Sequence, residues 1–109
     1  MNVYIHGTDE KSEENGKLRV EVVLSGNLDT NGSVDLQNAM SEIFKRGAGI
    51  NIVIDFYSVP FMSSAGLRVL LLATKKADAE GGSLKLQNVS DSIKEVLNMI
   101  GLSSILKII

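Results

Sequence analysis

The sequence predicts an α/β fold with a mixed, mostly parallel sheet of four to five strands and about three to four helices. Two observations lead to this prediction. Segments with the two-residue apolar period of strands alternate along the chain with segments that have a helical period, and such alternation implies parallel crossovers. The first two strands follow each other directly and supply an antiparallel edge. With 109 residues, we expect one domain over residues 1–109.

The first two strands are predicted to form a hairpin. Leu18–Leu24 alternates apolar and polar side chains, as a strand with one buried face does. Val3–His6 could pair with it across the polar stretch Thr8–Gly16, where Asn15-Gly16 is a turn signal. We expect the acidic residues of this loop to be solvated.

A helix and a central strand follow. From Ser33 onward apolar residues recur at positions i, i+3, i+4, i+7 and i+8, which predicts an amphipathic helix. The stripe consists of Leu36, Ala39, Met40, Ile43 and Phe44. The segment Ile50–Phe56 is nearly all apolar and β-branched, which is typical of a central strand covered on both faces by helices.

The next elements are a helix over Ser64–Glu80, ended by Gly81-Gly82, and a short strand over Leu84–Leu86. The first half of the helix is apolar on most sides, so we expect it to be buried and its polar second half to be exposed.

A final helix is predicted before the C-terminal tail. Ser90 or Ser92 can cap it, and Gly101 fits a left-handed stop. Its expected apolar stripe consists of Ile93, Val96, Leu97 and Ile100. The tail Ile105–Ile109 either adds an edge strand or packs as an extended segment.

Composition excludes several classes of function. The net charge is −2, the pI is near 5.3 and no Lys/Arg run is present, which argues against nucleic-acid binding. No apolar run approaches the roughly 20 residues of a membrane span, and the N-terminus does not resemble a secretory signal, so a cytoplasmic protein is expected. There is no cysteine, and His6 is the single histidine, so we expect no metal, no cofactor and no catalytic residue. No phosphate-binding glycine loop is present either.

The segment Asp55–Leu72 is the candidate functional site. It leads from the predicted central strand into a helix that begins with Ser63 and Ser64. Loops at the carboxyl ends of strands are where α/β sheets meet ligands, and the first turn of a helix favours an oxygen acceptor or a phosphate. Simple capping by one of the serines is an equally good interpretation of the residues alone.

The same segment resembles a known family signature. Residues 54–67 read Ile-Asp-Phe-x-x-Val-x-Phe-Met-Ser-Ser-Ala-Gly-Leu, which is similar to the signature of the STAS domain of bacterial anti-sigma factor antagonists. The similarity extends to Gly26-Asn27-Leu28-Asp29, to the Gly81-Gly82 turn and to Met99-Ile100-Gly101-Leu102.

The resemblance implies a STAS-like domain and a regulatory role. Members of this family are small cytoplasmic proteins that bind an anti-sigma factor and thereby release a sigma factor. The partner is often a serine kinase, of the GHKL type, that phosphorylates the antagonist, and a PP2C-type phosphatase removes the phosphate. The family motif places the acceptor on Ser64. Ser63 stands where the family usually has aspartate, and it is the alternative acceptor.

The resemblance and the position of the segment suggest six partner-binding residues. They are Asp29, Phe61, Met62, Ser63, Ser64 and Arg68. Four of them have an alternative interpretation that involves no partner. Asp29 could cap the first helix, Phe61 and Met62 could fill the core, and Arg68 could simply be solvated. The alternative functions are a STAS subunit that binds without phosphorylation, for example in a lipid transporter, and a nucleotide- or anion-binding protein.

Overall fold

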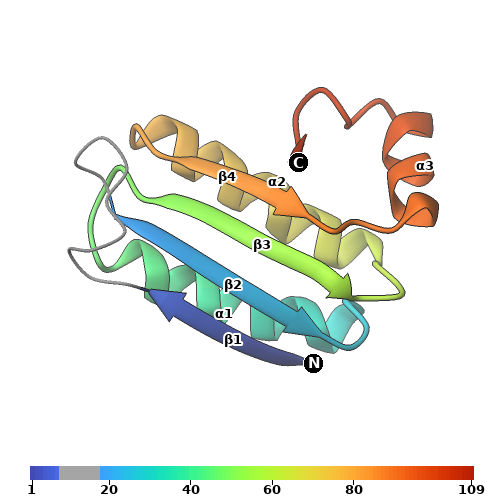
Figure 1. The fold of residues 1–109 in the computed structure, drawn as a ribbon, viewed down its shortest axis with the longest axis horizontal. Coiled ribbons are helices and arrows are strands. Elements are labelled where there is room, and N and C mark those ends of the chain that lie inside the picture. The colour runs from blue at the N-terminus through green and yellow to red at the C-terminus, as the bar shows by residue number, and fades with distance from the viewer. Residues whose placement is uncertain (8–17) are drawn as a thin grey trace.

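The computed structural model describes residues 1–7 and 18–109 (Figure 1). Its elements, in chain order, are β1 (Asn2–Gly7), β2 (Arg19–Ser25), α1 (Thr30–Phe44), β3 (Asn51–Ser58), α2 (Ser64–Ala79), β4 (Ser83–Gln87), α3 (Asp91–Met99) and β5 (Lys107–Ile108).

The sheet has five strands in the order β1-β2-β3-β4-β5. β1 runs antiparallel to β2, with Val3 opposite Leu24, and the other neighbours are parallel. The predicted mixed, mostly parallel sheet and the paired first strands are therefore confirmed, as is the central place of β3. The predicted turn at Asn15-Gly16 and its acidic loop lie outside the described residues.

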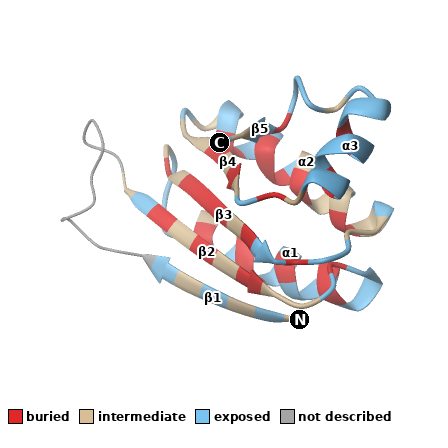
Figure 2. Ribbon diagram, turned by 45° about the vertical axis from the view of Figure 1, so that its right-hand side comes forward, coloured by how far each residue is buried: buried red, intermediate tan, exposed pale blue. Residues whose placement is uncertain are grey.

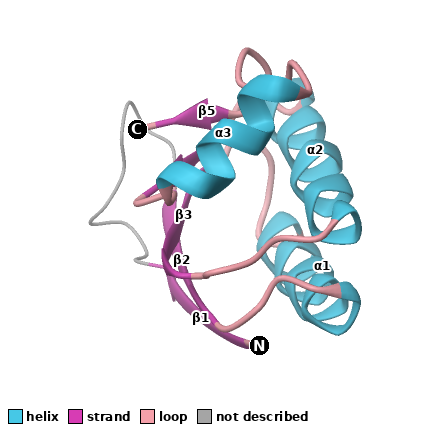
Figure 3. Ribbon diagram, turned by 90° about the vertical axis from the view of Figure 1, so that its right-hand side faces the viewer, coloured by secondary structure: helices cyan, strands magenta, loops and turns pink. Residues whose placement is uncertain are grey.

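Both long helices, α1 and α2, lie on the same face of the sheet (Figure 3). No helix of the described part covers the other face, so the prediction that β3 is covered on both faces is wrong. The apolar run suggested two covered faces because of Val53. This residue points to the face without helices, since side chains of a strand alternate between its faces, but it is apolar and buried as well. In register, Val53 lies between Glu21 and Lys85.

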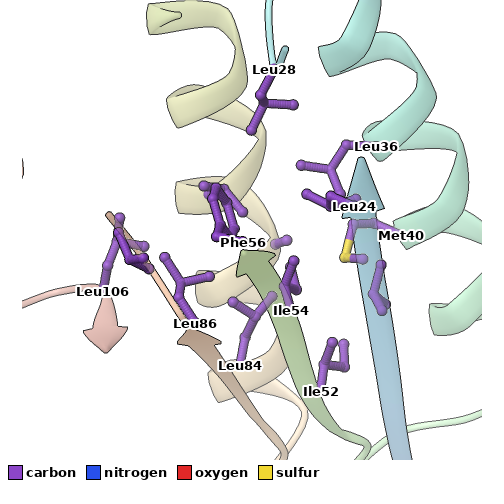
Figure 4. Packing of buried hydrophobic residues seen from close by; sticks show 14 of the residues in the cluster. Leu24, Leu28, Leu36, Met40, Ile52, Ile54, Phe56, Leu84, Leu86 and Leu106 are labelled. Atoms are coloured by element: carbon purple, nitrogen blue, oxygen red, sulfur yellow. The ribbon is translucent and has the colours of Figure 1, made fainter. Parts of the chain in front are cut away.

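The hydrophobic core lies between the sheet and these two helices (Figures 2 and 4). Alternate residues of β2, β3 and β4 point toward the helices because side chains of a strand alternate between its faces. Fully buried large side chains in this layer include Leu24, Leu36, Ile52, Ile54, Phe56, Leu70, Leu84 and Leu86.

Helices α1 and α2 differ from the predictions in detail. α1 begins at Thr30 rather than Ser33, because Asp29 caps it. α2 is buried along its whole length on one side: Thr74 and Ala77 in its second half are buried, whereas Leu72 has an exposed fraction of 59%. The predicted division into a buried first half and an exposed second half is therefore wrong, because the 3.6-residue period continues through the polar segment.

In α3 the cap is Ser90, whose Oγ accepts a hydrogen bond from the N–H of Ile93 at 3.2 Å, and not Ser92. Only part of the predicted stripe is buried: Ile93 and Leu97 are covered, whereas Val96 and Ile100 are about half exposed.

The glycine stop and the edge strand are confirmed. Gly101 has a φ of +74°, and the N–H of Leu102 donates to the carbonyl of Leu97 at 2.9 Å, as in a left-handed helix stop. The tail forms β5, and the N–H of Ile109 donates to the carbonyl of Leu86 at 2.8 Å.

Candidate functional site

The candidate site lies where the chain leaves the carboxyl ends of β2 and β3. Here the loops 26–29 and 59–63 run side by side and are joined by backbone hydrogen bonds. The N–H of Gly26 donates to the carbonyl of Ser58 at 3.0 Å, and the N–H of Leu28 donates to that of Phe61 at 2.9 Å. Leu28 and Met62 form a parallel bridge. These contacts fix the N-termini of α1 and α2 relative to each other.

Ser63 is the residue that caps α2. It has extended backbone angles (φ −85°, ψ 169°), and its Oγ accepts a hydrogen bond from the N–H of Gly66 at 3.2 Å. The same hydroxyl donates to the carbonyl of Leu28 at 3.0 Å, and the N–H of Ser63 donates to that carbonyl at 2.8 Å. The half-buried Ser63 hydroxyl is thus used both as donor and as acceptor, which supports the capping interpretation for this serine.

Gly66 allows the two loops to come this close. A Cβ atom at this position would lie 2.5 Å from Cγ of Leu28 and 2.9 Å from its carbonyl oxygen. Because Leu28 is fully buried, it has little room to move away. Only glycine therefore fits here without displacing the neighbouring loop.

Ser64 is the first residue of α2, and its side chain is exposed. Its hydroxyl makes no hydrogen bond with any residue that the structure describes, and the N–H groups of Ser64 and Ala65 have no acceptor there either. Unpaired N–H groups and the positive end of the helix dipole favour an anion at this point. A phosphate on Ser64 would lie close to these N–H groups and to the positive end of the dipole.

Arg68 lies one turn beyond Ser64 on the same side of α2, since residues four apart are neighbours on a helix. Its side chain is exposed, and among the described residues it takes part in no ion pair. The guanidinium is therefore available to a phosphate or to a carboxylate of a partner.

The remaining predicted residues divide between surface and scaffold. Phe61 has an exposed fraction of 51%, whereas Met62 is half-buried and packs against the core. Asp29 caps α1, because its Oδ1 accepts a hydrogen bond from the N–H of Gly32 at 2.8 Å. The structure therefore brings the six predicted residues to one end of the two helices, with Met62 and Ser63 partly buried among them.

Neither a cluster of metal-binding side chains nor a membrane-spanning helix is found in the described part of the chain. Within residues 1–7 and 18–109, no group of three or more His, Cys, Asp or Glu side chains could hold a metal ion. Among the same residues, no helix is both long and apolar enough to cross a membrane.

Leu28, whose carbonyl oxygen joins the two loops, was named only as part of the family resemblance and was given no role in the site. An apolar residue that acts through its backbone leaves no signal in its own side chain. The signal that was available is Gly66, because a glycine inside the first turn of a helix indicates a close approach by another segment.

Comparisons with known proteins show to which family the chain belongs. The family described as "Mlab, STAS domain" matches residues 13–107. Over 108 residues the chain is 30% identical to the anti-sigma-B factor antagonist of Bacillus subtilis (strain 168), with 99% of this chain and 92% of that protein covered. It is 33% identical over 108 residues to the anti-sigma F factor antagonist of Paenibacillus polymyxa, with 99% and 87% covered.

Among solved structures, the fold is similar to that of the anti-sigma factor antagonist SpoIIAA. The unphosphorylated form gives a TM-score of 0.73 at 23% identity, with 97% of this chain and 88% of that chain covered. The phosphorylated form gives 0.68 at 23% identity, with 97% and 91% covered. Because the family model matches residues 13–107 and two relatives are at least 30% identical over nearly the whole chain, the chain belongs to the STAS domain family.

Proposed function

We propose that this protein is a cytoplasmic anti-sigma factor antagonist controlled by phosphorylation. In its unphosphorylated form it binds an anti-sigma factor, a serine kinase of the GHKL type, and thereby releases a sigma factor. The kinase transfers a phosphate to Ser64, which ends the binding, and a PP2C-type phosphatase restores it. The names of the two curated relatives, antagonists of anti-sigma-B and anti-sigma F factors, support the partner class.

The observation that carries the proposal is the difference between the two serines. The hydroxyl of Ser64 is exposed and unpaired among the described residues, whereas that of Ser63 makes two hydrogen bonds. In the transfer, Oγ of Ser64 forms a bond to the γ-phosphorus of ATP, the bond from that phosphorus to the β–γ bridging oxygen breaks, ADP leaves and the hydroxyl proton is released. Ser63 would have to give up both hydrogen bonds before it could react.

A phosphate on Ser64 is compatible with the fold of the protein that carries it. It adds roughly 1.5 to 2 negative charges at pH 7, and these would lie beside the unpaired N–H groups at the start of α2. The consequence falls on the complex. A partner surface that fits a neutral hydroxyl must desolvate the new charge, and each 1.4 kcal/mol or so of mismatch weakens binding about tenfold.

Three neighbours of Ser64 would form the recognition surface. Phe61 offers an exposed aromatic ring directly before the helix, and aromatic residues are frequent anchors of interfaces. Asp29 offers a carboxylate at the start of the adjacent helix, and Arg68 a guanidinium one turn along α2. The surface thus combines an apolar anchor with charges of both signs, which suits recognition of one defined partner.

The proposal is tested by phosphorylation with purified partners. The protein is incubated with ATP and with each anti-sigma factor kinase of its source organism, and then digested with trypsin. The Lys and Arg positions predict one peptide, residues 47–68, that carries Tyr57, Ser58, Ser63 and Ser64 together, so fragmentation must locate the phosphate. We expect it on Ser64, abolished by Ser64→Ala and retained by Ser63→Ala.

Two other results would contradict the proposal in different ways. A phosphate on Ser63 in the unaltered protein would keep the switch but move its site. A peptide that stays unmodified with every kinase, while the protein remains bound to a stable partner in cells, would indicate a binding subunit that acts without phosphorylation.

A further inference from the structure

A groove of about 500 Å³ lies between α1 and α2. Its apolar lining consists of Met40, Phe44, Val69, Leu72 and Ala73. Leu72 contributes an unusually exposed side chain for a leucine in the middle of a helix, with an exposed fraction of 59%. An exposed leucine in an open, mainly apolar groove is typical of a surface that a partner covers.

The charged residues that line this groove are all cations. They are Lys45, Arg68 and Lys76, although the whole chain has a net charge of −2. Lys45 and Lys76 form ion pairs with Glu42 and Glu80, at 3.6 and 3.1 Å, whereas Arg68 forms no ion pair with described residues. The groove therefore offers an unneutralised positive charge to an acidic segment.

On α2 the groove begins at Arg68, one turn beyond Ser64. Helices α1 and α2 run in the same direction (Figure 1), so Arg68 lies at the end near the switch and Lys76 at the far end. At the far end Nζ of Lys76 lies 5.4 Å from the centre of the Phe44 ring, which links the two helices there. From Arg68 to Lys76 the helix rises about 12 Å, which is the length of about two turns of a docked helix.

We propose that this groove receives an acidic amphipathic helix of the anti-sigma factor, with an apolar side chain against Leu72 and a carboxylate paired with Arg68. This inference rests on the function proposed above and extends the interface from Ser64 along α2. It also gives the phosphate a second effect, because a phosphate on Ser64 lies one turn from Arg68 and competes for the guanidinium that the partner's carboxylate needs.

Three methionines allow the docking to be observed directly. Met40 lines the groove, Met62 lies beside Ser63, and Met99 is exposed on α3. The protein is labelled with ¹³C at its methionine methyl groups and titrated with the anti-sigma factor that the phosphorylation test identifies. We expect the methyl signals of Met40 and Met62 to shift together and that of Met99 to stay in place.

Charge and apolar substitutions with matched controls test the contacts. We expect Arg68→Glu to weaken binding at least tenfold and Leu72→Gln about three- to tenfold. Arg19→Glu makes the same charge reversal on the exposed side of β2, and Val96→Gln makes a similar polar change on α3. Both controls should stay within twofold of the unaltered protein, and thermal unfolding verifies that all four variants are folded.

The outcomes separate this inference from the function on which it rests. If Met62 shifts without Met40, or if Arg68→Glu and Leu72→Gln bind as the controls do, the groove is not the docking surface although the antagonist function stands. If the unaltered protein binds none of the anti-sigma factors, the proposed function fails and the groove loses its occupant with it.

Discussion

The hydroxyl of Ser63 donates a hydrogen bond to the carbonyl oxygen of Leu28 at 3.0 Å, across a sequence separation of 35 residues. The same carbonyl accepts the N–H of Ser63 at 2.8 Å. One serine thus caps its own helix and holds the loop that leads into the neighbouring helix. The residue beside it, Ser64, is left with an exposed hydroxyl that forms no hydrogen bond with the described residues.

Replacing Ser63 by alanine should therefore destabilise the fold. The variant loses the side-chain acceptor for the N–H of Gly66, and losing such a cap costs about 1 kcal/mol. The carbonyl of Leu28 keeps the backbone donor, so little more should be lost there. Thermal unfolding should show a midpoint about 4 to 8 °C lower.

Ser64→Ala is the matched control, because it removes an exposed hydroxyl from the next position. Its midpoint should stay close to that of the unaltered protein, and Ser63→Thr, which keeps a hydroxyl, should recover most of the stability. Equal midpoints for Ser63→Ala and Ser64→Ala would show that the cap of α2 contributes no stability.

Gly66→Ala should also destabilise the protein, although the same change inside an ordinary helix stabilises by up to about 1 kcal/mol. The added methyl group would lie 2.5 Å from Cγ of the buried Leu28. Overpacking of this kind costs about 1 to 3 kcal/mol, so the steric term exceeds the gain in helix propensity. Urea unfolding measures the net effect, and a variant more stable than the unaltered protein would contradict the close contact.

Asp29 can be tested so that its two roles are separated. Asp29→Asn keeps an oxygen that can accept the N–H of Gly32, whereas Asp29→Ala removes it and should cost about 1 kcal/mol. If the exposed carboxylate also contacts the anti-sigma factor, Asp29→Asn should remain near the stability of the unaltered protein but bind several-fold more weakly. Unfolding curves and binding titrations on both variants decide this. Unchanged binding by Asp29→Asn would leave capping as the role of this residue.

The sequence predicted the order of elements because most of them have their own apolar period and the helices carry start or stop signals. Gly101 and the Ser-Ser start of α2 are such signals, and both mark real helix ends. The covering of β3 could not be predicted, because a single additional valine, Val53, makes a one-sided strand look two-sided. Apolar periodicity reports the composition of a strand and does not say which other elements lie against its faces.

The site was predictable in position and only partly in detail. The two serines, the helix start and Arg68 are visible as sequence features. Apart from the family resemblance, however, the residues give both serines the same capacity, because the bond from Ser63 to Leu28 joins residues 35 positions apart. Long-range backbone contacts of this kind have no local signature, and here one of them distinguishes the scaffold serine from the exposed one.

The last prediction concerns a fixed negative charge at Ser64. Ser64→Asp should fold as the unaltered protein does, because a carboxylate in the first turn of a helix is favoured by about 0.3 to 1 kcal/mol. It should nevertheless bind the anti-sigma factor at least tenfold more weakly than Ser64→Ala, since the partner must desolvate the charge. The side chain introduced by Ser64→Asn has nearly the same size as that of Ser64→Asp but no charge. The difference in binding affinity between these two variants therefore separates the electrostatic effect from the steric one. Titration calorimetry of the three variants measures the binding, and thermal unfolding verifies the fold. If the Ser64→Asp and Ser64→Asn variants bind equally weakly, the partner is sensitive to side-chain size at this position. If Ser64→Asp binds as tightly as Ser64→Ala, charge at Ser64 does not control the complex.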